Sequence, residues 1–266
     1  MICDFHLHTK MSYDSDAAID DVICSAISKD MKHIAITDHH DFDLDNGAFE
    51  QKNPRAYYDT IYGYKEKYSG KINISVGIEL GLEARQAKKL YAFTSLCPFD
   101  FIIGSIHCVD GIDPYYSDFW KGLTVKEGME KYFDAIIESL NVYDDFDVLG
   151  HMDYIIRYVL NKAESIYSYH DFHDRLDTIL HKIISMGKGI EINTGSLRRG
   201  LNTTNPSEEI IKKYREYGGK IITVGSDAHT VSDIGADFTT AREILLRCGF
   251  SEYCIFEKRQ PVFIKL

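Results

Sequence analysis

Seven short apolar runs are spread along the chain, and most of them end in a histidine or a carboxylate. The runs cover residues 2–8, 33–40, 72–80, 99–107, 146–151, 189–195 and 220–229. Between them, apolar residues recur at three- and four-residue steps in residues 16–31, 124–143, 169–187 and 205–219, which is the period of an amphipathic helix. Short strands that alternate with helices predict a parallel sheet. We therefore expect an α/β fold, a TIM-like (β/α)7 barrel that is distorted because it has seven strands rather than eight.

The length and composition of the chain fit one domain of this kind. Its 266 residues match the roughly 250 residues of a typical α/β barrel. No repeat, low-complexity segment or linker divides the sequence, so we expect a single domain over residues 1–266. Hydrophobic residues make up 44% and charged residues 27% of the chain, which is typical of a globular protein. Residues 252–266 predict a final hairpin outside the main repeat, with Pro261 in or near its turn.

Charge and cysteine content narrow the range of partners and compartments. The formal net charge of −11 disfavours nucleic acid or an anionic membrane as the main partner, because both bind basic surfaces. The sequence contains no apolar run of about 20 residues, and no signal peptide is recognised at its start. The six cysteines have neither CxxC spacing nor the density of a disulfide framework. These features predict a cytoplasmic protein with free thiols, and they leave its oligomeric state open.

The residues at the ends of six runs are of types that bind metal ions. In the first run, His6 and His8 lie one residue apart, so they point to the same face of an extended strand. A half-buried strand with two unrelated histidines would give the same pattern, so the other runs must decide. Those runs contribute His39, His40, Glu79, His107, His151, Asp227 and His229. Because a barrel brings the carboxyl ends of its strands to one mouth, we expect these side chains to meet there.

The chemistry of this set indicates a cluster of divalent metal ions. It contains imidazoles and carboxylates without thiolate, which suits zinc, manganese or iron(II). The ligands are more numerous than a single ion needs, so two or three ions are expected. Two ions roughly 3.5–4 Å apart can hold a hydroxide and stabilise the oxygens of an in-line displacement at phosphorus. Such ions also reverse the local field, so an acidic chain can still bind an anionic substrate. Hydrolysis of a phosphoester fits these features best.

Six motifs resemble those of the PHP family, which is named for polymerase and histidinol phosphatase. In chain order they read HLHT, ITDHH, GIELG, GSIH, LGHMDY and GSDAH, and the resemblance covers nearly the whole sequence. The segments GSIHCVDGID and DVLGHMDYIIRY are most similar to the histidinol-phosphate phosphatase branch. The resemblance implies a distorted seven-stranded barrel with a trinuclear metal centre. It also implies a phosphomonoesterase of histidine biosynthesis, in which a metal-bridging hydroxide hydrolyses L-histidinol phosphate to L-histidinol and phosphate.

The resemblance further implies how the ligands divide among three divalent ions, which are zinc, manganese or iron. The implied ligands of the first ion are His6, His8, Glu79 and Asp227. Those of the second ion are Glu79 as a bridge, His107 and His151. Those of the third ion are His39, His229 and a residue of the loop after the first strand. Many relatives have histidine in that loop, whereas this chain has Asp14, with Asp16 as a competing assignment. Catalytic roles are implied for Asp227, Glu79 and His229.

Further polar residues near the strand ends are candidates for substrate contacts. Guanidinium groups match phosphate oxygens, and the resemblance supports Arg157 and Arg198 as phosphate ligands, whereas Arg199 is expected on the surface. His40 is expected to face the substrate or to support a metal ligand. Glu191 either binds the ammonium group of the substrate or fills the barrel interior.

Other residues keep two interpretations open. Asp38 and Asp153 either orient metal-bound imidazoles or are surface carboxylates, and the loop aromatics Tyr115, Tyr116 and Trp120 either meet an imidazole ring or simply pack. The remaining histidines are assigned no function: His33, His170, His173 and His181. Two alternative functions also remain: a PHP phosphoesterase for a nucleotide, sugar phosphate or phosphotyrosine, and a non-catalytic metal-binding PHP module.

Overall fold

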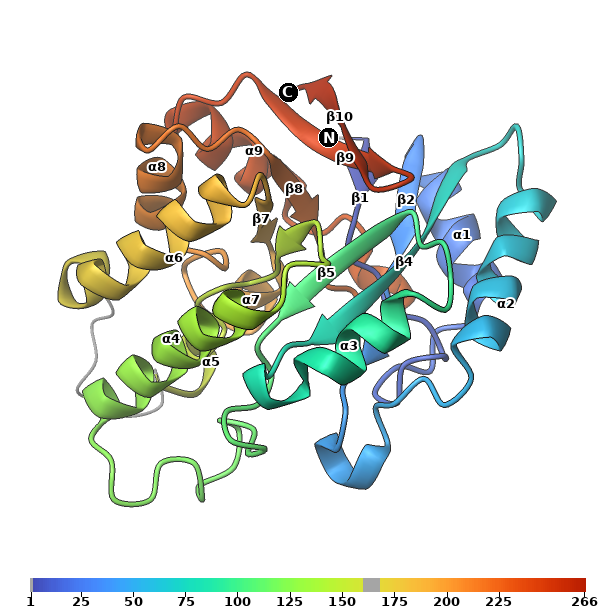
Figure 1. Ribbon diagram of the computed structural model, residues 1–266. Helices are drawn as coiled ribbons and strands as arrows, with labels where there is room; N and C mark the ends of the chain where they lie inside the picture. Colours follow the sequence, from blue (N-terminus) through green and yellow to red (C-terminus); the bar gives the residue numbers. More distant parts are fainter. Residues whose placement is uncertain (1, 160–167) are drawn as a thin grey trace.

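The computed structural model describes residues 2–159 and 168–266, and its centre is a barrel of seven parallel strands (Figure 1). Along the barrel the strands follow the order β1-β2-β4-β5-β6-β7-β8, and β3 continues the run of β2 and pairs with β4. Their bounds are β1 (Cys3–Asp4), β2 (His33–Ile36), β3 (His39–His40), β4 (Asn73–Gly81), β5 (Phe101–Ser105), β6 (Val148–Leu149), β7 (Gly189–Asn193) and β8 (Ile222–Gly225). The predicted α/β barrel with seven strand runs is confirmed.

The barrel is distorted at the seam between β1 and β8. There the two edges are joined by single backbone hydrogen bonds rather than by a regular ladder: Phe5 N–H to Val224 O at 2.9 Å, Asp227 N–H to His6 O at 2.9 Å and His8 N–H to Ala228 O at 3.0 Å. The central strands, by contrast, are buried on both faces, as strands of a helix-covered parallel sheet must be. The backbone hydrogen bonds at the seam thus involve three of the predicted metal ligands, His6, His8 and Asp227.

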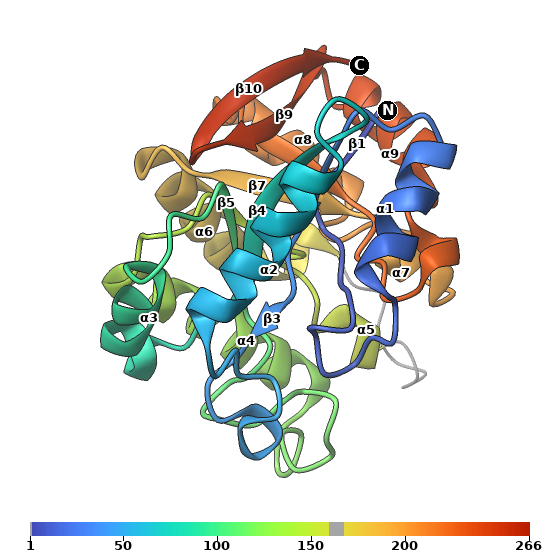
Figure 2. The same ribbon diagram turned by 90° about the vertical axis from the view of Figure 1, so that its right-hand side faces the viewer.

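Helices lie around the outside of the sheet (Figure 1 and Figure 2). Their bounds are α1 (Ile19–Ser28), α2 (Pro54–Lys67), α3 (Ala87–Thr94), α4 (Val125–Val142), α5 (Ile156–Val159), α6 (His173–Ser185), α7 (Gly195–Arg198), α8 (Glu208–Glu216) and α9 (Phe238–Arg247). Helices α1, α4, α6 and α8 lie within the four stretches predicted from periodicity. A capping box of Thr124 and Glu127 starts α4. Across the described residues, none of the helices has the length and apolar character needed to traverse a bilayer.

A two-stranded hairpin covers the amino-terminal end of the barrel (Figure 1). It consists of β9 (Glu252–Glu257) and β10 (Gln260–Lys265), and its turn residues Lys258 and Arg259 have φ angles of 50° and 65°. The hairpin is tied to the barrel by Ser75 Oγ, which donates to Phe256 O at 2.9 Å. Pro261 follows the first residue of β10, so the expected hairpin with a proline near its turn is confirmed. With this end covered, the opposite end of the barrel forms the mouth.

Candidate metal centre

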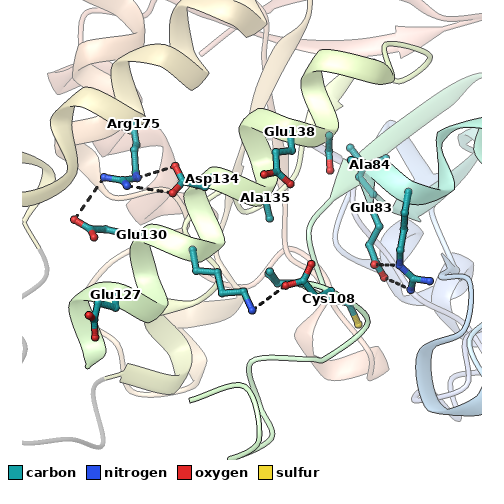
Figure 3. A pocket seen from close by; sticks show the side chains of 15 residues that line it. Glu83, Ala84, Cys108, Glu127, Glu130, Asp134, Ala135, Glu138 and Arg175 are labelled. Atoms are coloured by element: carbon teal, nitrogen blue, oxygen red, sulfur yellow. Dashed lines mark hydrogen bonds and ion pairs between the residues drawn. The ribbon is translucent and has the colours of Figure 1, made fainter. Parts of the chain in front are cut away.

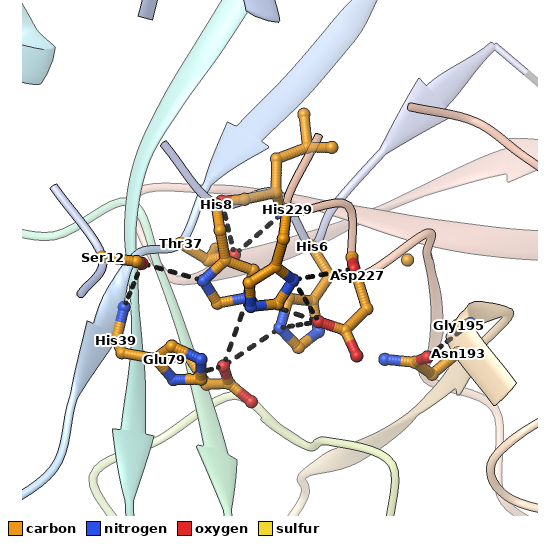
Figure 4. Close-up of polar contacts among 12 residues, drawn as sticks. His6, His8, Ser12, Thr37, His39, Glu79, Asn193, Gly195, Asp227 and His229 are labelled. Atoms are coloured by element: carbon orange, nitrogen blue, oxygen red, sulfur yellow. Dashed lines mark hydrogen bonds and ion pairs between the residues drawn. The ribbon is translucent and has the colours of Figure 1, made fainter. Parts of the chain in front are cut away.

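The predicted metal ligands converge at the carboxyl end of the barrel, and Figure 4 shows part of this cluster: His6, His8, His39, Glu79, Asp227 and His229. His39 belongs to β3 and Glu79 to β4, Asp14 lies in the loop between β1 and α1, and the others follow strand ends by two to four residues. The register of the parallel pair β3–β4 sets His39 opposite Glu79 and His40 opposite Leu80. Because successive residues of a strand face opposite sides, His39 turns toward the barrel interior and His40 toward the surrounding helices.

Glu79 lies at the centre of the cluster and is fully buried. Its Oε2 is 3.1 Å from His6 Nε2 and 3.5 Å from His8 Nε2. Its Oε1 is 2.9 Å from His151 Nε2 and 3.2 Å from His107 Nε2. Oε2 also lies 3.0 Å from His39 Nδ1. The two carboxylate oxygens thus face different groups of imidazoles, three at Oε2 and two at Oε1, which is the arrangement that a carboxylate bridging two ions requires.

Asp227 and Asp14 add further carboxylate oxygens to the cluster, Asp227 beside His6 and His8 and Asp14 beside His39 and His229. Asp227 Oδ1 lies 3.4 Å from His8 Nε2 and 3.8 Å from His6 Nε2. Asp14 Oδ2 lies 3.1 Å from His229 Nε2 and 3.7 Å from His39 Nε2. Asp14 is thus the loop carboxylate that the structure brings to the imidazoles of His39 and His229. The geometry therefore brings all nine predicted ligands into one cluster.

The charges within the cluster keep its carboxylates ionised. Burial by itself would raise the pKa of Glu79, but His6, His107 and His39 hold it well below its usual range. In the same way, His6, His8 and Arg157 hold the pKa of Asp227 well below its usual range against the effect of burial. Burial and the neighbouring His229 and His39 lower the pKa of His8 well below its ordinary value. The cluster therefore offers ionised carboxylates together with an imidazole, that of His8, that stays neutral.

Several polar atoms in this cluster are buried and lack a hydrogen-bond partner. These atoms are His6 Nε2, His8 Nε2, His39 Nδ1 and Glu79 Oε2. A buried polar atom without a partner is costly, and here the atoms face one another with lone pairs that a cation would satisfy. The donor set of imidazoles and carboxylates suits zinc, manganese or iron. The residues therefore fit divalent metal ions.

Asp38 supports the cluster indirectly. His8 Nδ1 lies 3.0 Å from Ser12 Oγ, and that hydroxyl donates to Asp38 Oδ1 at 2.9 Å. Burial raises the pKa of Asp38 to about 6. Asp153, in contrast, accepts from the side chain of Asn205 at 2.6 Å and from the N–H of Ser207 at 3.0 Å. It thus holds a loop after β7 rather than a ligand imidazole.

Two residues predicted to contact the substrate lie away from the open face of the cluster. Glu191 is 1% exposed, and its Oε1 lies 2.6 Å from His6 Nδ1, behind that ring. His40 is 2% exposed, stacks on Phe93 with ring centroids 3.7 Å apart, and accepts from Gln51 N–H at Nδ1. The predicted substrate contacts of Glu191 and His40 therefore have no support in the structure.

A small cavity of about 110 Å³ opens on the metal-ligand cluster, and its wall carries two arginines. Arg157 Nη2 lies 3.0 Å from Asp227 Oδ2, and the guanidinium stands over the ring of Tyr154. The second arginine is Arg199, which is exposed, as expected, and also reaches the edge of the cavity. Arg198, the predicted phosphate ligand, instead donates to Ser226 O at 2.5 Å behind the cluster. Arg198 and Arg199 are adjacent residues at the end of α7, and adjacent helical residues point in different directions.

The cavity wall also contains two polar residues, Asp113 and Tyr154, that were not among the predicted site residues. Asp113 lies in the loop after β5, and burial raises the pKa of its carboxyl. Tyr154 packs near His151, with ring centroids 5.0 Å apart. Tyr154 ends the motif LGHMDY, and Asp113 stands beside the aromatic segment 115–120. Those neighbours were the available signals, but a carboxylate or tyrosine in a loop is too common to be selected by type alone.

The loop aromatics divide into exposed and packed side chains. Tyr115 is 67% exposed and makes an edge contact with Tyr158. Tyr116 donates its hydroxyl hydrogen to Asp45 at 3.1 Å. Trp120 Nε1 donates to Pro114 O at 2.7 Å, within the same loop. Of the three predicted ring contacts, Tyr115 is the side chain that remains most accessible beside the mouth.

A larger groove of about 630 Å³ lies outside the mouth, between α4 and the loops after β4 and β5 (Figure 3). Most of its charged side chains pair with one another. The closest pairs are Arg175 with Asp134 at 2.8 Å, Lys131 with Asp110 at 2.8 Å and Arg85 with Glu83 at 2.6 Å. This pairing leaves the groove without the converging, unpartnered groups of the smaller cavity, so the smaller cavity is the candidate active site.

Comparison with known proteins agrees with this geometry. Residues 4–195 match the family model of the PHP domain. A probable histidinol-phosphatase of Clostridium acetobutylicum is 33% identical over 263 residues, which cover 97% of this chain and 98% of that protein. A histidinol-phosphatase of Lactococcus lactis is 28% identical over 254 residues, which cover 95% of this chain and 93% of that protein.

Two solved structures of related proteins have a similar three-dimensional fold. The histidinol phosphate phosphatase of Lactococcus lactis, crystallised with zinc, L-histidinol and phosphate, superposes with a TM-score of 0.89 at 26% identity and covers 98% of both chains. A putative histidinol phosphatase of Listeria monocytogenes, 17% identical with a TM-score of 0.77, shares the fold and covers 90% of this chain and 99% of that chain. The family match, the full-length relatives and the strand-end ligands agree: this chain belongs to the PHP domain family.

Proposed function

We propose that this protein is a metal-dependent histidinol-phosphatase, which hydrolyses L-histidinol phosphate to L-histidinol and phosphate. The observation that carries the proposal is the cluster around Glu79, whose two oxygens face different groups of imidazoles beneath a cavity lined by arginine. Full-length relatives named histidinol-phosphatase support the substrate. So does a relative solved with zinc, L-histidinol and phosphate.

The cluster supports a centre of three divalent ions. His6, His8 and Asp227 with Glu79 Oε2 would hold the first ion, and His107 and His151 with Glu79 Oε1 the second. His39, His229 and Asp14 would hold the third. Zinc is the first metal to test, because the related structure contains it. Bound ions supply a hydroxide at neutral pH and stabilise charge on the phosphoryl oxygens.

The protein's own groups then bind and orient the phosphate. Arg157 and Arg199 line the cavity on the side of Asp227 and present guanidinium hydrogens to phosphate oxygens. The carboxylate of Asp227 holds Arg157 in place, since the pair is buried and only 3.0 Å apart. Charge that develops on the phosphoryl oxygens is thus met by two guanidinium groups, of which Arg157 is held in place.

The amino-imidazole part of the substrate has complementary groups at the same mouth. Asp113 is a cavity carboxylate outside the metal-ligand set, and it accepts from the backbone N–H of Tyr115 at 2.8 Å. It is therefore our candidate partner for the substrate ammonium, in place of Glu191. The rings of Tyr154 and Tyr115 offer aromatic faces for an imidazole.

The decisive experiment is a comparison of phosphate release from several phosphomonoesters by the metal-loaded protein. Histidinol phosphate should be preferred in kcat/KM over p-nitrophenyl phosphate and sugar phosphates, although nitrophenolate is the better leaving group. Such a preference requires binding energy from the amino-imidazole part to be used in the transition state. Equal efficiencies would contradict the proposed substrate, and a preference for a nucleotide or phosphotyrosine would assign the chain another one.

Three variants refine this test. Asp113→Asn should lower kcat/KM for histidinol phosphate by about 10- to 150-fold, from a charged hydrogen bond of about 1.5–3 kcal/mol, and should spare p-nitrophenyl phosphate. Arg199→Ala should reduce kcat/KM for both esters by a similar factor, whereas the neighbouring variant Arg198→Ala should have the smaller effect. If Arg198→Ala proved the more damaging of the two, the phosphate would have to be reassigned to Arg198.

A further inference from the structure

Two buried carboxylates outside the predicted ligand set each lie against the Nδ1 atom of a ligand histidine. Glu191 Oε1 is 2.6 Å from His6 Nδ1, and Asp41 Oδ1 is 2.7 Å from His107 Nδ1. Glu191 is 1% exposed and Asp41 is 2% exposed. Neither carboxylate lies among the residues that line the cavity at the mouth. Their contacts therefore act on the metal centre from behind.

The two supported histidines face opposite oxygens of the same central carboxylate. His6 Nε2 lies 3.1 Å from Glu79 Oε2, whereas His107 Nε2 lies 3.2 Å from Glu79 Oε1. At each oxygen of Glu79, one of the imidazoles therefore has its other ring nitrogen, Nδ1, in contact with a second carboxylate. In the proposed metal centre, Glu191 would act on the first ion and Asp41 on the second.

Glycines on neighbouring strands make room for both carboxylates. A Cβ atom added at Gly225 would lie 2.2 Å from Glu191 Oε1, and one added at Gly81 would lie 1.8 Å from Asp41 Oδ1. Both separations are far below van der Waals contact, so any larger residue would displace the carboxylate. These spaces indicate that each carboxylate occupies a formed position.

Further hydrogen bonds hold Glu191 in that position. Its Oε2 accepts from the backbone N–H of His151 at 3.0 Å and from Asn193 Nδ2 at 3.2 Å. Asn193 is itself fixed, because its Oδ1 accepts from Gly195 N–H at 2.8 Å. β7, which carries no predicted metal ligand, thus contributes to the centre through the support of His6.

We propose that Glu191 and Asp41 are positioning residues, which hold His6 and His107 so that each presents Nε2 to a different metal ion. This inference rests on the metal centre of the proposed function. A carboxylate that accepts the Nδ1–H fixes the ring orientation and makes Nε2 a more basic ligand. Loss of such a partner typically lowers metal affinity or activity by about 10- to 100-fold.

The test uses Glu191→Gln and Asp41→Asn, which keep the shape of the side chain and remove its charge. Zinc affinity is measured by competition with a chromophoric chelator, and retained ions are counted by elemental analysis. Glu191→Gln should weaken zinc binding at the first site, and Asp41→Asn should weaken it at the second site, each by about 10- to 100-fold. In proton spectra of the zinc-loaded wild type, two imidazole N–H signals should lie far downfield. Glu191→Gln should shift one of these signals and Asp41→Asn the other.

A matched control separates positioning from general stability. Asp147→Asn also removes a buried carboxylate, but one that is paired with Arg259 at the hairpin end of the barrel. This control should lower thermal stability and keep wild-type zinc affinity. If either variant fails to fold, the two downfield signals of the wild type and the remaining variant still decide the question.

Wild-type zinc affinity in both variants, or a shift of the same N–H signal by both, would overturn the inference. Neither the zinc affinity nor the proton spectrum requires substrate. If the wild type bound zinc as expected but released no phosphate from histidinol phosphate, the proposed function would fail while the positioning roles stood. If phosphate were released but zinc affinity did not respond to either variant, only the positioning roles would fail.

Discussion

Replacing Asp4 with asparagine should loosen the seam of the barrel. Asp4 is the last residue of β1, and its fully buried carboxylate accepts four hydrogen bonds. Oδ1 accepts from the N–H groups of Ser226 at 3.0 Å and His6 at 3.3 Å, and Oδ2 accepts from Ser226 Oγ at 2.5 Å and Gly235 N–H at 2.9 Å. Since β1 and β8 share no regular ladder, this carboxylate is a main tie between them.

The size of the effect follows from these contacts. In Asp4→Asn the best orientation puts the amide nitrogen in the place of Oδ2, because the Ser226 hydroxyl can rotate and accept. Gly235 N–H then faces another donor, and one unsatisfied buried N–H costs about 1–3 kcal/mol. Burial raises the pKa of Asp4, so the neutral amide also avoids burying a charge, and this gain favours the lower end of the range.

Urea unfolding of the metal-free protein at pH 7 measures this loss directly. We expect a decrease of about 1–3 kcal/mol in the free energy of unfolding, and thermal unfolding of the same variant should show a fall in Tm of roughly 2–4 °C per kcal/mol. The control is Asp59→Asn, which changes an exposed carboxylate and should stay within about 0.5 kcal/mol of the wild type. A variant at Asp4 as stable as the wild type would refute the reasoning that this carboxylate ties the seam.

Two further predictions concern the metal bridge and the pH dependence of stability. Glu79→Gln should lower the affinity for two ions together, because its oxygens face both groups of imidazoles, and elemental analysis after dialysis that showed loss of one ion only would contradict the bridge. Burial, helped by Lys65, lowers the pKa of His33 to about 4, below the 6.5 expected when unfolded. The unfolded chain therefore takes up this proton first, so the contribution of His33 is present above pH 6.5 and declines by up to about 3 kcal/mol as the pH falls to 4. Metal-free His33→Asn should show a shallower loss of unfolding free energy between pH 6.5 and 4 than the wild type, and equal slopes would contradict this assignment.

The sequence by itself determined the strand and helix order and the group of residues that meet at the mouth. Apolar residues recur at every second position in a strand and at every third or fourth position in a helix, and this periodicity is a local property of the chain. A parallel barrel brings the carboxyl ends of all its strands to the same mouth. For that reason nine ligand-type residues at strand ends could be grouped from the sequence, and all of them except His40 meet in the cluster, where Asp14 joins them from a loop. The final hairpin was equally local, since its strands are adjacent in sequence.

The tertiary structure alone decided which way neighbouring side chains point. The register of β3 on β4 turns His39 toward Glu79 and His40 toward Phe93. At the end of α7, Arg199 lines the cavity while Arg198 turns to the backbone of Ser226. A shift of one residue reverses the face of a strand and rotates a helix position by about 100°. Residue type and spacing identify a segment that reaches the site, but only the packed backbone sets the direction of each side chain.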